Sequence, residues 1–368
     1  MKFGQCYNKL LNKSILFNVN VQNTRNKSTK TIEKTVIISK SRDIYTNLAL
    51  EHWFFKNWDF TNKHLLMLWT NNPCVVIGKF QNPWLECNIP HLKTLTPSGV
   101  KLARRNSGGG TVYHDPGNLN LTFFTSNQDL NRKHNLEMVK NAILKRFGLE
   151  IIVSDRDDLI YGDYKVSGTA ARYTRTTSYH HCTLLVNADK NILSKSLQKP
   201  SYFIKTNASQ STRSPIKNLN ELNQKITIPE LIQPISKEYL TTLPYLKDNF
   251  DINLISNHNI HHVNPTEEDY PELLDFRDEM KSSEWIFGSC PDFTATKLIN
   301  LDESTEIKVN FNVVKGIVTD VDVENNFNRK LYLELFKDRK FDENLFEEIK
   351  DCLNKELNQS VVHKSINN

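Results

Sequence analysis

Short strand-like segments separated by turn signals, with few helices between them, constrain the fold of this chain more than any other feature. Residues 118–123 alternate between Asn or Thr and Leu or Phe, a pattern typical of a half-buried strand. Gly162-Asp163 separates the strand-like runs 158–161 and 164–166, and such a pair predicts a tight hairpin. Hairpins without a regular strand–helix–strand rhythm favour an α+β fold over a doubly wound parallel sheet.

Two helices are marked by the residues at their ends. Asp43 is a suitable N-cap for a helix over residues 44–55. Residues 135–147 place apolar side chains at helical spacing, and Gly148 ends that helix as a C-cap residue. Further strands are expected at residues 65–69, 74–78, 100–104 and 181–187.

The last third of the chain predicts a second, smaller α+β domain of roughly 100 residues. Residues 256–268 are polar and indicate a linker. Residues 307–313 then alternate as a strand, Lys315-Gly316 makes a turn, and residues 317–323 return. One helical face closes the pattern with Leu345, Ile349, Cys352 and Leu357.

Charge is concentrated at the N-terminus. Residues 1–32 carry six basic residues and no acid, although the whole chain has a net charge of only +5. Without those six, 41 basic residues face 42 acidic ones, so the remainder carries −1 and shows no basic excess for nucleic acid. The acid-free stretch, rich in Asn, Ser, Thr and Lys, predicts a mitochondrial transit peptide; a basic tail is the alternative interpretation.

Composition excludes several other classes. No apolar run approaches the ~18–20 residues that a membrane span needs. The six cysteines are scattered and never form a C-x-x-C pair, which argues against a zinc site and against a disulfide framework.

The segment with the most chemical content runs from Arg104-Arg105 through three consecutive glycines to Asp115. Three glycines let the main chain approach a ligand closely, and their N–H groups suit phosphate or carbonyl oxygens. The two arginines add bidentate donors. The segment fits neither a P-loop nor G-x-G-x-x-G, and a plain glycine-rich turn remains the alternative.

Lys165, just past the predicted hairpin and followed by Val-Ser-Gly-Thr, is the second candidate. A lysine held on a strand can place its ammonium on a developing negative charge, whereas most lysines are simply solvated. His180-His181 is weak support for zinc, and Cys182, on the opposite face from Thr183, is expected in the core.

These segments together resemble the lipoate–protein ligase and lipoyltransferase family. The resemblance lies in KLARRNSGGGTVYHDPGNLNLTFF (residues 101–124), DYKVSGTAARYTRTTSYHHCTLLVNAD (163–189) and EWIFG (284–288), in that order, and covers about residues 40–325. VVIGKFQNPWLECN (75–88) and HHCTLL are most similar to the animal mitochondrial branch of the family.

The resemblance implies a biotin/lipoyl protein ligase-like α+β catalytic domain, related to class II synthetases, with a small C-terminal accessory domain. The corresponding division is a transit peptide at 1–32, a catalytic domain at 33–260 and an accessory domain at 261–368. The implied activity is transfer of a lipoyl or octanoyl group, from lipoyl-AMP or a lipoylated carrier protein, to a lysine of lipoyl domains.

The resemblance also assigns site residues. Lys165 is the catalytic lysine that touches the acyl carbonyl and the phosphate. Residues implied near the adenylate or the acyl chain are Arg105, Gly108, Gly109, Gly110, Thr111, Val112, Tyr113, Arg156, Thr183, Thr212 and Ser214. No metal ligand is implied.

The resemblance also implies partners, and the residues leave several alternatives open. The acceptors are lipoyl domains of E2 subunits of 2-oxoacid dehydrogenases in the mitochondrial matrix, with the glycine-cleavage H protein as a second donor and a monomeric enzyme expected. No nucleic acid or membrane partner is expected. The alternatives are an ATP- and Mg-dependent ligase that also makes lipoyl-AMP, an acyl-thioester route through Cys182, an RNA-binding module using the arginines, and a biotin ligase.

Overall fold

A computed structural model describes residues 32–245, 256–302, 305–324 and 329–366. The predicted transit peptide therefore lies outside the described residues, apart from Ile32. The chain forms two compact units, which interleave along the sequence. Unit one comprises Met1–Cys74, His114–Asp189 and Arg213–Met280, and unit two comprises Val75–Tyr113, Lys190–Thr212 and Lys281–Asn368.

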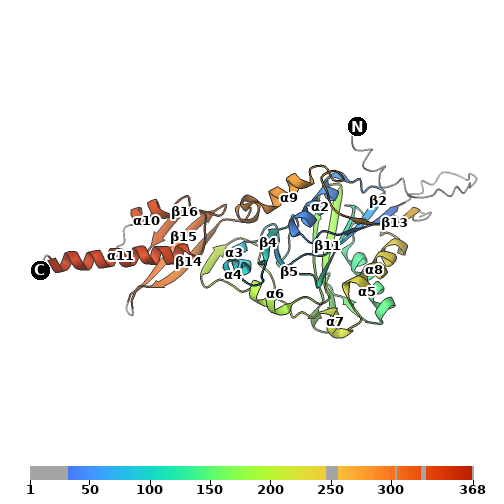
Figure 1. Ribbon diagram of the computed structural model, residues 1–368, viewed down its shortest axis with the longest axis horizontal. Coiled ribbons are helices and arrows are strands. Elements are labelled where there is room, and N and C mark those ends of the chain that lie inside the picture. Colours follow the sequence, from blue (N-terminus) through green and yellow to red (C-terminus); the bar gives the residue numbers. More distant parts are fainter. Residues whose placement is uncertain (1–31, 246–255, 303–304, 325–328, 367–368) are drawn as a thin grey trace, which may run out of the picture. The chain divides into compact units, whose positions relative to one another are not determined.

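A six-stranded sheet in the order β10-β11-β6-β2-β1-β13 forms the centre of unit one (Figure 1). β1 pairs in parallel with β2 and β13, and the other neighbours are antiparallel. The strands are β1 (Glu33–Ser39), β2 (Lys63–Trp69), β6 (Asn118–Ser126), β10 (Ser167–Tyr173), β11 (Thr177–Leu185) and β13 (Ser256–Val263). A small antiparallel sheet adds β7 (Ile152–Val153), β8 (Leu159–Tyr161) and β9 (Tyr164–Lys165).

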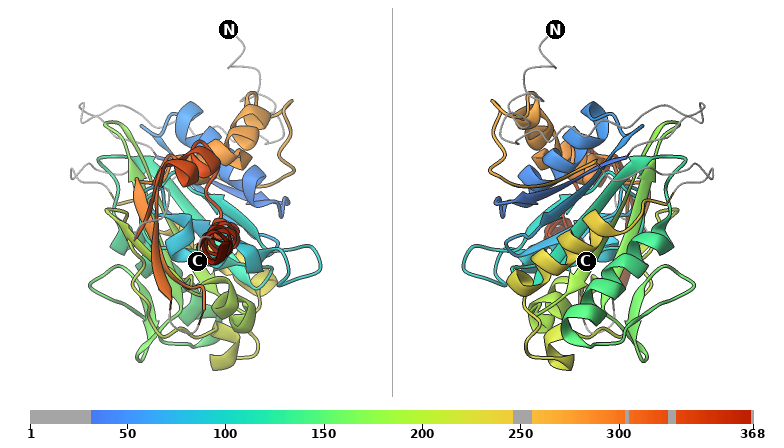
Figure 2. Two further views of the ribbon diagram at one scale, coloured as in Figure 1. Left: turned by 90° about the vertical axis from the view of Figure 1, so that its left-hand side faces the viewer. Right: turned by 90° about the vertical axis from the view of Figure 1, so that its right-hand side faces the viewer.

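Helices cover both faces of the six-stranded sheet. α5 (Arg132–Phe147) and α8 (Ile228–Thr241) lie side by side on one face, as Figure 2 shows, and share its apolar core. α2 (Ile44–Asn57) covers the other face, where Glu51 accepts a hydrogen bond from Thr122 of β6. The unit also contains α7 (Leu219–Leu222) and α9 (Leu273–Lys281).

Unit two contains a four-stranded antiparallel sheet and a three-stranded sheet. The first, in the order β12-β14-β15-β16, packs with the last two helices around the second core cluster. The second has the order β4-β3-β5. The elements are β3 (Cys74–Ile77), α3 (Pro83–Glu86), α4 (Ile89–Leu92), β4 (Lys101–Arg104), β5 (Val112–His114), α6 (Lys190–Ser196), β12 (Phe203–Thr206), the π-helix η1 (Glu284–Gly288), β14 (Phe293–Asn300), β15 (Glu306–Val314), β16 (Ile317–Val323), α10 (Arg329–Phe336) and α11 (Leu345–Ile366).

The α+β fold class is confirmed, and most of the predicted elements lie where the pattern placed them. Asp43 caps α2 by accepting a hydrogen bond from the Thr46 amide, and Gly148 ends α5 at φ 66°. Gly162, at φ 56°, forms the predicted hairpin between β8 and β9. Within the described residues, no helix has both the length and the apolar character needed to cross a membrane.

Two predictions about secondary structure were wrong. Residues 256–268 are not simply a linker, because their first eight residues form β13, an edge strand paired with β1 through the main chain. β6 is not half-buried, because Asn118, Asn120 and Thr122 on its polar face are buried as well, with Glu51 of α2 packed against Thr122. These polar residues are buried and hydrogen-bonded instead of solvated.

Candidate active site

Lys165 is held on both sides by the main chain of unit one. It pairs with Ile160 in the β8–β9 hairpin, while its amide donates to the Pro215 carbonyl at 2.9 Å. Its Nζ lies 2.7 Å from Oδ1 of Asp158, and the two side chains are 28% and 16% exposed. Lys165 is therefore a half-buried, oriented ammonium and not a freely solvated one.

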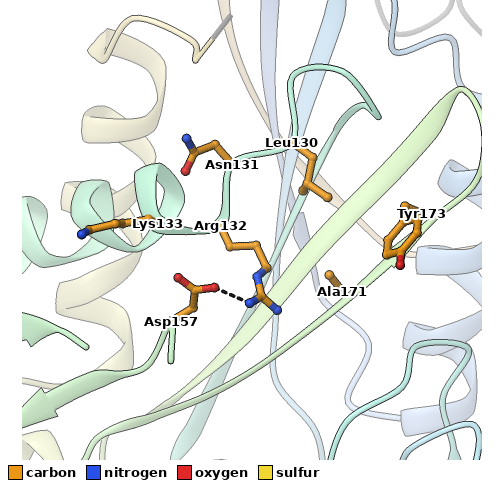
Figure 3. A pocket seen from close by; sticks show the side chains of 7 residues that line it. All are labelled: Leu130, Asn131, Arg132, Lys133, Asp157, Ala171 and Tyr173. Atoms are coloured by element: carbon orange, nitrogen blue, oxygen red, sulfur yellow. Dashed lines mark hydrogen bonds and ion pairs between the residues drawn. The ribbon is translucent and has the colours of Figure 1, made fainter. Parts of the chain in front are cut away.

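The loop before β8 carries Arg156 and Asp158 and is fixed by a neighbouring ion pair. Asp157 adopts φ 57° and pairs with Arg132 at the start of α5, as Figure 3 shows. These two side chains line a surface pocket with Tyr173 and Ala171 of β10 (Figure 3). Arg156 is exposed, so its guanidinium is available for a ligand.

Thr183 links β10 to β11, the two strands within the lysine motif (residues 163–189). Its Oγ1 accepts a hydrogen bond from the Gly168 amide at 2.9 Å, across the β10–β11 pair. Cys182 faces the opposite way, into the core with Leu121 and Leu184, and burial raises the pKa of its thiol to about 12. A thiolate at Cys182 is therefore not accessible, which argues against the thioester route.

The sheet face under α2 holds a buried polar network that the sequence did not reveal as such. Glu51 is 2% exposed and bonds to Thr122 at 2.8 Å and to His181 at 2.9 Å. Burial alone would raise the pKa of Glu51, but the charge and hydrogen bond of His181 outweigh it and hold the pKa low. On the opposite face of β11, where His180 lies against Asn135 of α5, burial lowers the pKa of His180 to about 3, so that its ring is neutral. Within the described ranges, no cluster of three potential ligands could hold a metal ion.

In unit two, Arg105 shapes the glycine segment. Its side chain is 4% exposed. Its Nη2 donates to the carbonyls of Gly108 (2.6 Å) and Gly110 (2.7 Å), Nη1 to Val76 (3.1 Å), and Nε to the Ser107 hydroxyl (2.9 Å). The glycine carbonyls are thus turned toward the guanidinium.

The backbone requires glycine at two positions near this segment, at Gly78 because of a close approach and at Gly109 because of its positive φ. A Cβ on Gly78 would lie 2.2 Å from the carbonyl oxygen of Gly109, which itself adopts φ 86°. A Cβ on Gly108 would meet nothing within 4 Å, so this glycine borders open space. The segment is a tightly fixed loop with one open side, as a main-chain ligand site requires.

Arg104 fixes the main chain of residues 78–81, which lies next to the glycine segment. Its side chain is fully buried, and its guanidinium donates to carbonyls of Gly78, Lys79 and Gln81 at 2.8–3.2 Å. It also donates to the carbonyls of Trp285 and Ile286 in η1. The EWIFG segment is therefore a structural partner of Arg104.

The predicted site residues fall into two groups. Unit one contains Arg156, Lys165, Thr183 and Ser214; unit two contains Arg105, Gly108, Gly109, Gly110, Thr111, Val112, Tyr113 and Thr212. Thr212 and Ser214 are exposed, whereas the Tyr113 ring is buried among Val75, Ile77 and Leu92. The residues that the sequence did not single out are Asp158, Glu51, Gln81, Glu86 and Ser211.

The fold and these two segments define an α+β enzyme of the biotin/lipoate ligase-like type. The family model described as the lipoyl protein ligase A/B catalytic domain matches residues 43–240. The chain belongs to this family of lipoyl-transferring enzymes.

Several relatives agree. The mitochondrial lipoyl amidotransferase LIPT1 of Homo sapiens is 39% identical over 302 residues, covering 80% of this chain and 77% of the relative. Lipoate-protein ligase A of Psychrobacter cryohalolentis is 36% identical over 251 residues, covering 67% and 70%.

Solved structures show the same fold. P. falciparum LipL1 in complex with lipoate has a TM-score of 0.58 and 26% identity, covering 88% of this chain and 99% of that one. A bipartite lipoate protein ligase of Thermoplasma acidophilum, described with its E2 lipoyl domain, has a TM-score of 0.55 and 21% identity, covering 70% and 96%.

Proposed function

We propose that this enzyme transfers a lipoyl or octanoyl group from an acyl-adenylate, or from a lipoylated carrier protein, to a lysine of E2 lipoyl domains. The observation that carries the proposal is the oriented ammonium of Lys165, 2.7 Å from Asp158, within the family's lysine motif. The human relative named lipoyl amidotransferase supports transfer as the reaction.

An acyl-adenylate is a mixed anhydride that already carries the activation. The neutral amine of the acceptor lysine on the lipoyl domain attacks the carbonyl carbon. This attack builds negative charge on the carbonyl oxygen and then on the departing AMP. Lys165 stabilises this charge, and one such donor contributes about 3–4 kcal/mol, or 10²–10³ in rate. Burial of the C8 chain contributes ~0.8 kcal/mol per CH₂ to binding.

The other site residues have supporting roles in this proposal. The main chain of Gly108 to Gly110 contacts the adenylate on the open side of the loop. Arg105 contributes chiefly by fixing that loop, because its donors bond to the loop's own carbonyls. Arg156, Thr212 and Ser214 contact the nucleotide from exposed positions, and Thr183 orders the strand pair beside Lys165.

The proposed location is the mitochondrial matrix. The acid-free N-terminal stretch and the mitochondrial relatives both support it. The proposed acceptors are lipoyl domains, which the archaeal ligase described with its E2 lipoyl domain supports. The H protein of glycine cleavage is a second donor in this proposal.

The test uses purified protein, synthetic lipoyl-AMP and an apo lipoyl domain. Lys165→Ala should lower the transfer rate by about 10²-fold or more, while Lys205→Ala, which changes an exposed lysine of β12, should leave it unchanged. Circular dichroism should show both variants folded. A Lys165→Ala enzyme with the wild-type rate would overturn the assignment.

A second candidate function is an ATP-dependent lipoate ligase, which the similarity to a bacterial lipoate-protein ligase favours. Such an enzyme makes its own lipoyl-AMP from lipoate, ATP and Mg²⁺. Lipoate-dependent exchange of pyrophosphate into ATP would establish this function, whereas transfer from lipoyl-AMP without exchange would establish the first.

A further inference from the structure

The QNPWLE segment (residues 81–86) is part of the family resemblance, but the proposed function assigns it no role. Its last four residues form the short helix α3 in unit two. Asn82 caps this helix by accepting hydrogen bonds from the amides of Trp84 and Leu85, and Pro83 occupies the first turn. The geometry of this turn is therefore fixed by the sequence itself.

Trp84 anchors the helix in the core of unit two. Its ring is 5% exposed and lies 5.1 Å from the ring of Phe293, 5.2 Å from Phe287 and 5.4 Å from Phe341. Aromatic packing of this extent holds the helix backbone firmly. Glu86, two residues later on the same helix, therefore has a fixed backbone position.

Glu86 is a buried carboxylate whose hydrogen-bond partners all lie next to the glycine segment. Its side chain accepts from the Ser211 amide at 3.1 Å, from the Ser211 hydroxyl at close range, and from the Thr111 hydroxyl at 3.2 Å. The residue is 9% exposed, so these bonds replace most of its hydration. A buried carboxylate is tolerated only with such donors.

Gln81 completes the connection. Its Oε1 accepts from the Gly78 amide at 2.8 Å and from the Thr111 hydroxyl at 2.9 Å, and its Nε2 donates to the Ser211 hydroxyl at 3.0 Å. The Thr111 amide also donates to that hydroxyl, at 2.8 Å. We call Gln81, Glu86, Thr111 and Ser211 the Glu86 clamp.

The clamp ties residues 209–212 to the glycine segment. A Cβ on Gly110 would lie 3.2 Å from the Ser211 hydroxyl, so the two main chains are close there. A second tie is the Ser209 amide, which donates to the Phe80 carbonyl at 3.1 Å. Thr212, a proposed nucleotide contact, follows the clamped serine directly in the chain.

We propose that Gln81, Glu86 and Ser211 are positioning residues for the acyl-adenylate: they hold Thr212 and the main chain of Gly108 to Gly110 in the arrangement that binds it. The inference rests on the proposed function. It also makes Thr111 a positioning residue, because its amide bonds to Ser211 and its hydroxyl to Gln81 and Glu86.

The test compares Ser211→Ala and Glu86→Ala with Ser209→Ala, an exposed serine of the same segment. Hydrogen exchange of the peptide covering residues 206–212 should be faster in the two clamp variants and unchanged in Ser209→Ala. The KM for synthetic lipoyl-AMP should rise about tenfold in the clamp variants, because misplacement of positioning groups weakens binding. The KM for the apo lipoyl domain should stay at the wild-type value.

Unchanged exchange in Ser211→Ala would overturn the proposal, and so would faster exchange with an unchanged KM for lipoyl-AMP. Ser211→Ala is the smaller change, so it still tests the proposal if Glu86→Ala does not fold. Lys165→Ala is measured in parallel: if it retains full activity, the proposed catalytic site fails, whereas the clamp is judged by exchange and by the KM for lipoyl-AMP.

Discussion

The buried Lys34 is expected to make the free energy of unfolding of unit one rise with pH above neutrality. This β1 lysine is 2% exposed, and its Nζ donates to the carbonyls of Tyr239 (2.8 Å) and Thr242 (2.6 Å) at the end of α8. The ammonium also lies 4.7 Å from the centre of the Tyr239 ring. Burial nevertheless dominates and lowers the pKa of Lys34 from 10.5 to about 7.

The sign and size of the effect follow from this shift. Between the folded pKa of about 7 and the unfolded value of 10.5, the unfolded chain holds one proton more than the folded one. The free energy of unfolding therefore rises with pH across this window, by about 1.4 kcal/mol per pH unit where the difference is complete. Integration gives Lys34 a contribution of about 2 kcal/mol between pH 7 and pH 9.

Urea unfolding followed by far-UV circular dichroism at pH 7 and pH 9 measures this contribution. Lys34→Met removes the titrating group, and Lys237→Met changes an exposed lysine on α8 as the matched control. The wild type should gain about 2 kcal/mol more than Lys34→Met over this range, and Lys237→Met should follow the wild type. If the free energies of unfolding of wild type and Lys34→Met differ by the same amount at pH 7 and pH 9, the reasoning is refuted.

Three further predictions concern Arg104, Gly78 and Cys182. Arg104→Met should lower the free energy of unfolding of unit two by about 3 kcal/mol or more, measured by urea unfolding, because five main-chain carbonyls lose a charged donor. Gly78→Ala should raise the KM for lipoyl-AMP, since its Cβ would lie 2.2 Å from the Gly109 oxygen, and an unchanged KM would contradict this. Cys182→Ala should keep the transfer rate within about twofold, because no thiolate takes part.

The sequence was sufficient to predict those elements whose conformation depends on their own residues. The Gly162-Asp163 hairpin, the Gly148 end of α5 and the Lys315-Gly316 turn all depend on residues that accept positive φ, and all were predicted. The alternating strands β15 and β16 were equally clear, because one face of each is buried in the core of unit two.

Sequence patterns failed where a distant element determines burial. β13 is polar because it lies at a sheet edge, and its pairing with β1 uses main-chain groups that carry no side-chain signature. The alternation in β6 predicted one solvated face, but that face is buried, and Glu51 of α2 is the partner of Thr122. A polar side chain in a strand does not reveal whether its partner is water or a buried carboxylate.

The arginine pair shows the same limit at the candidate site. The sequence favoured Arg104 and Arg105 as charged donors toward a ligand, but every hydrogen bond described above for their guanidinium groups is made inside unit two. The physical reason lies in the glycines. A loop that exposes its amides to a ligand turns its carbonyls the other way, and buried carbonyls need donors. Arginine, with five donors in a fixed plane, meets that need, so an arginine beside a glycine run can serve the loop's own main chain before it serves any substrate.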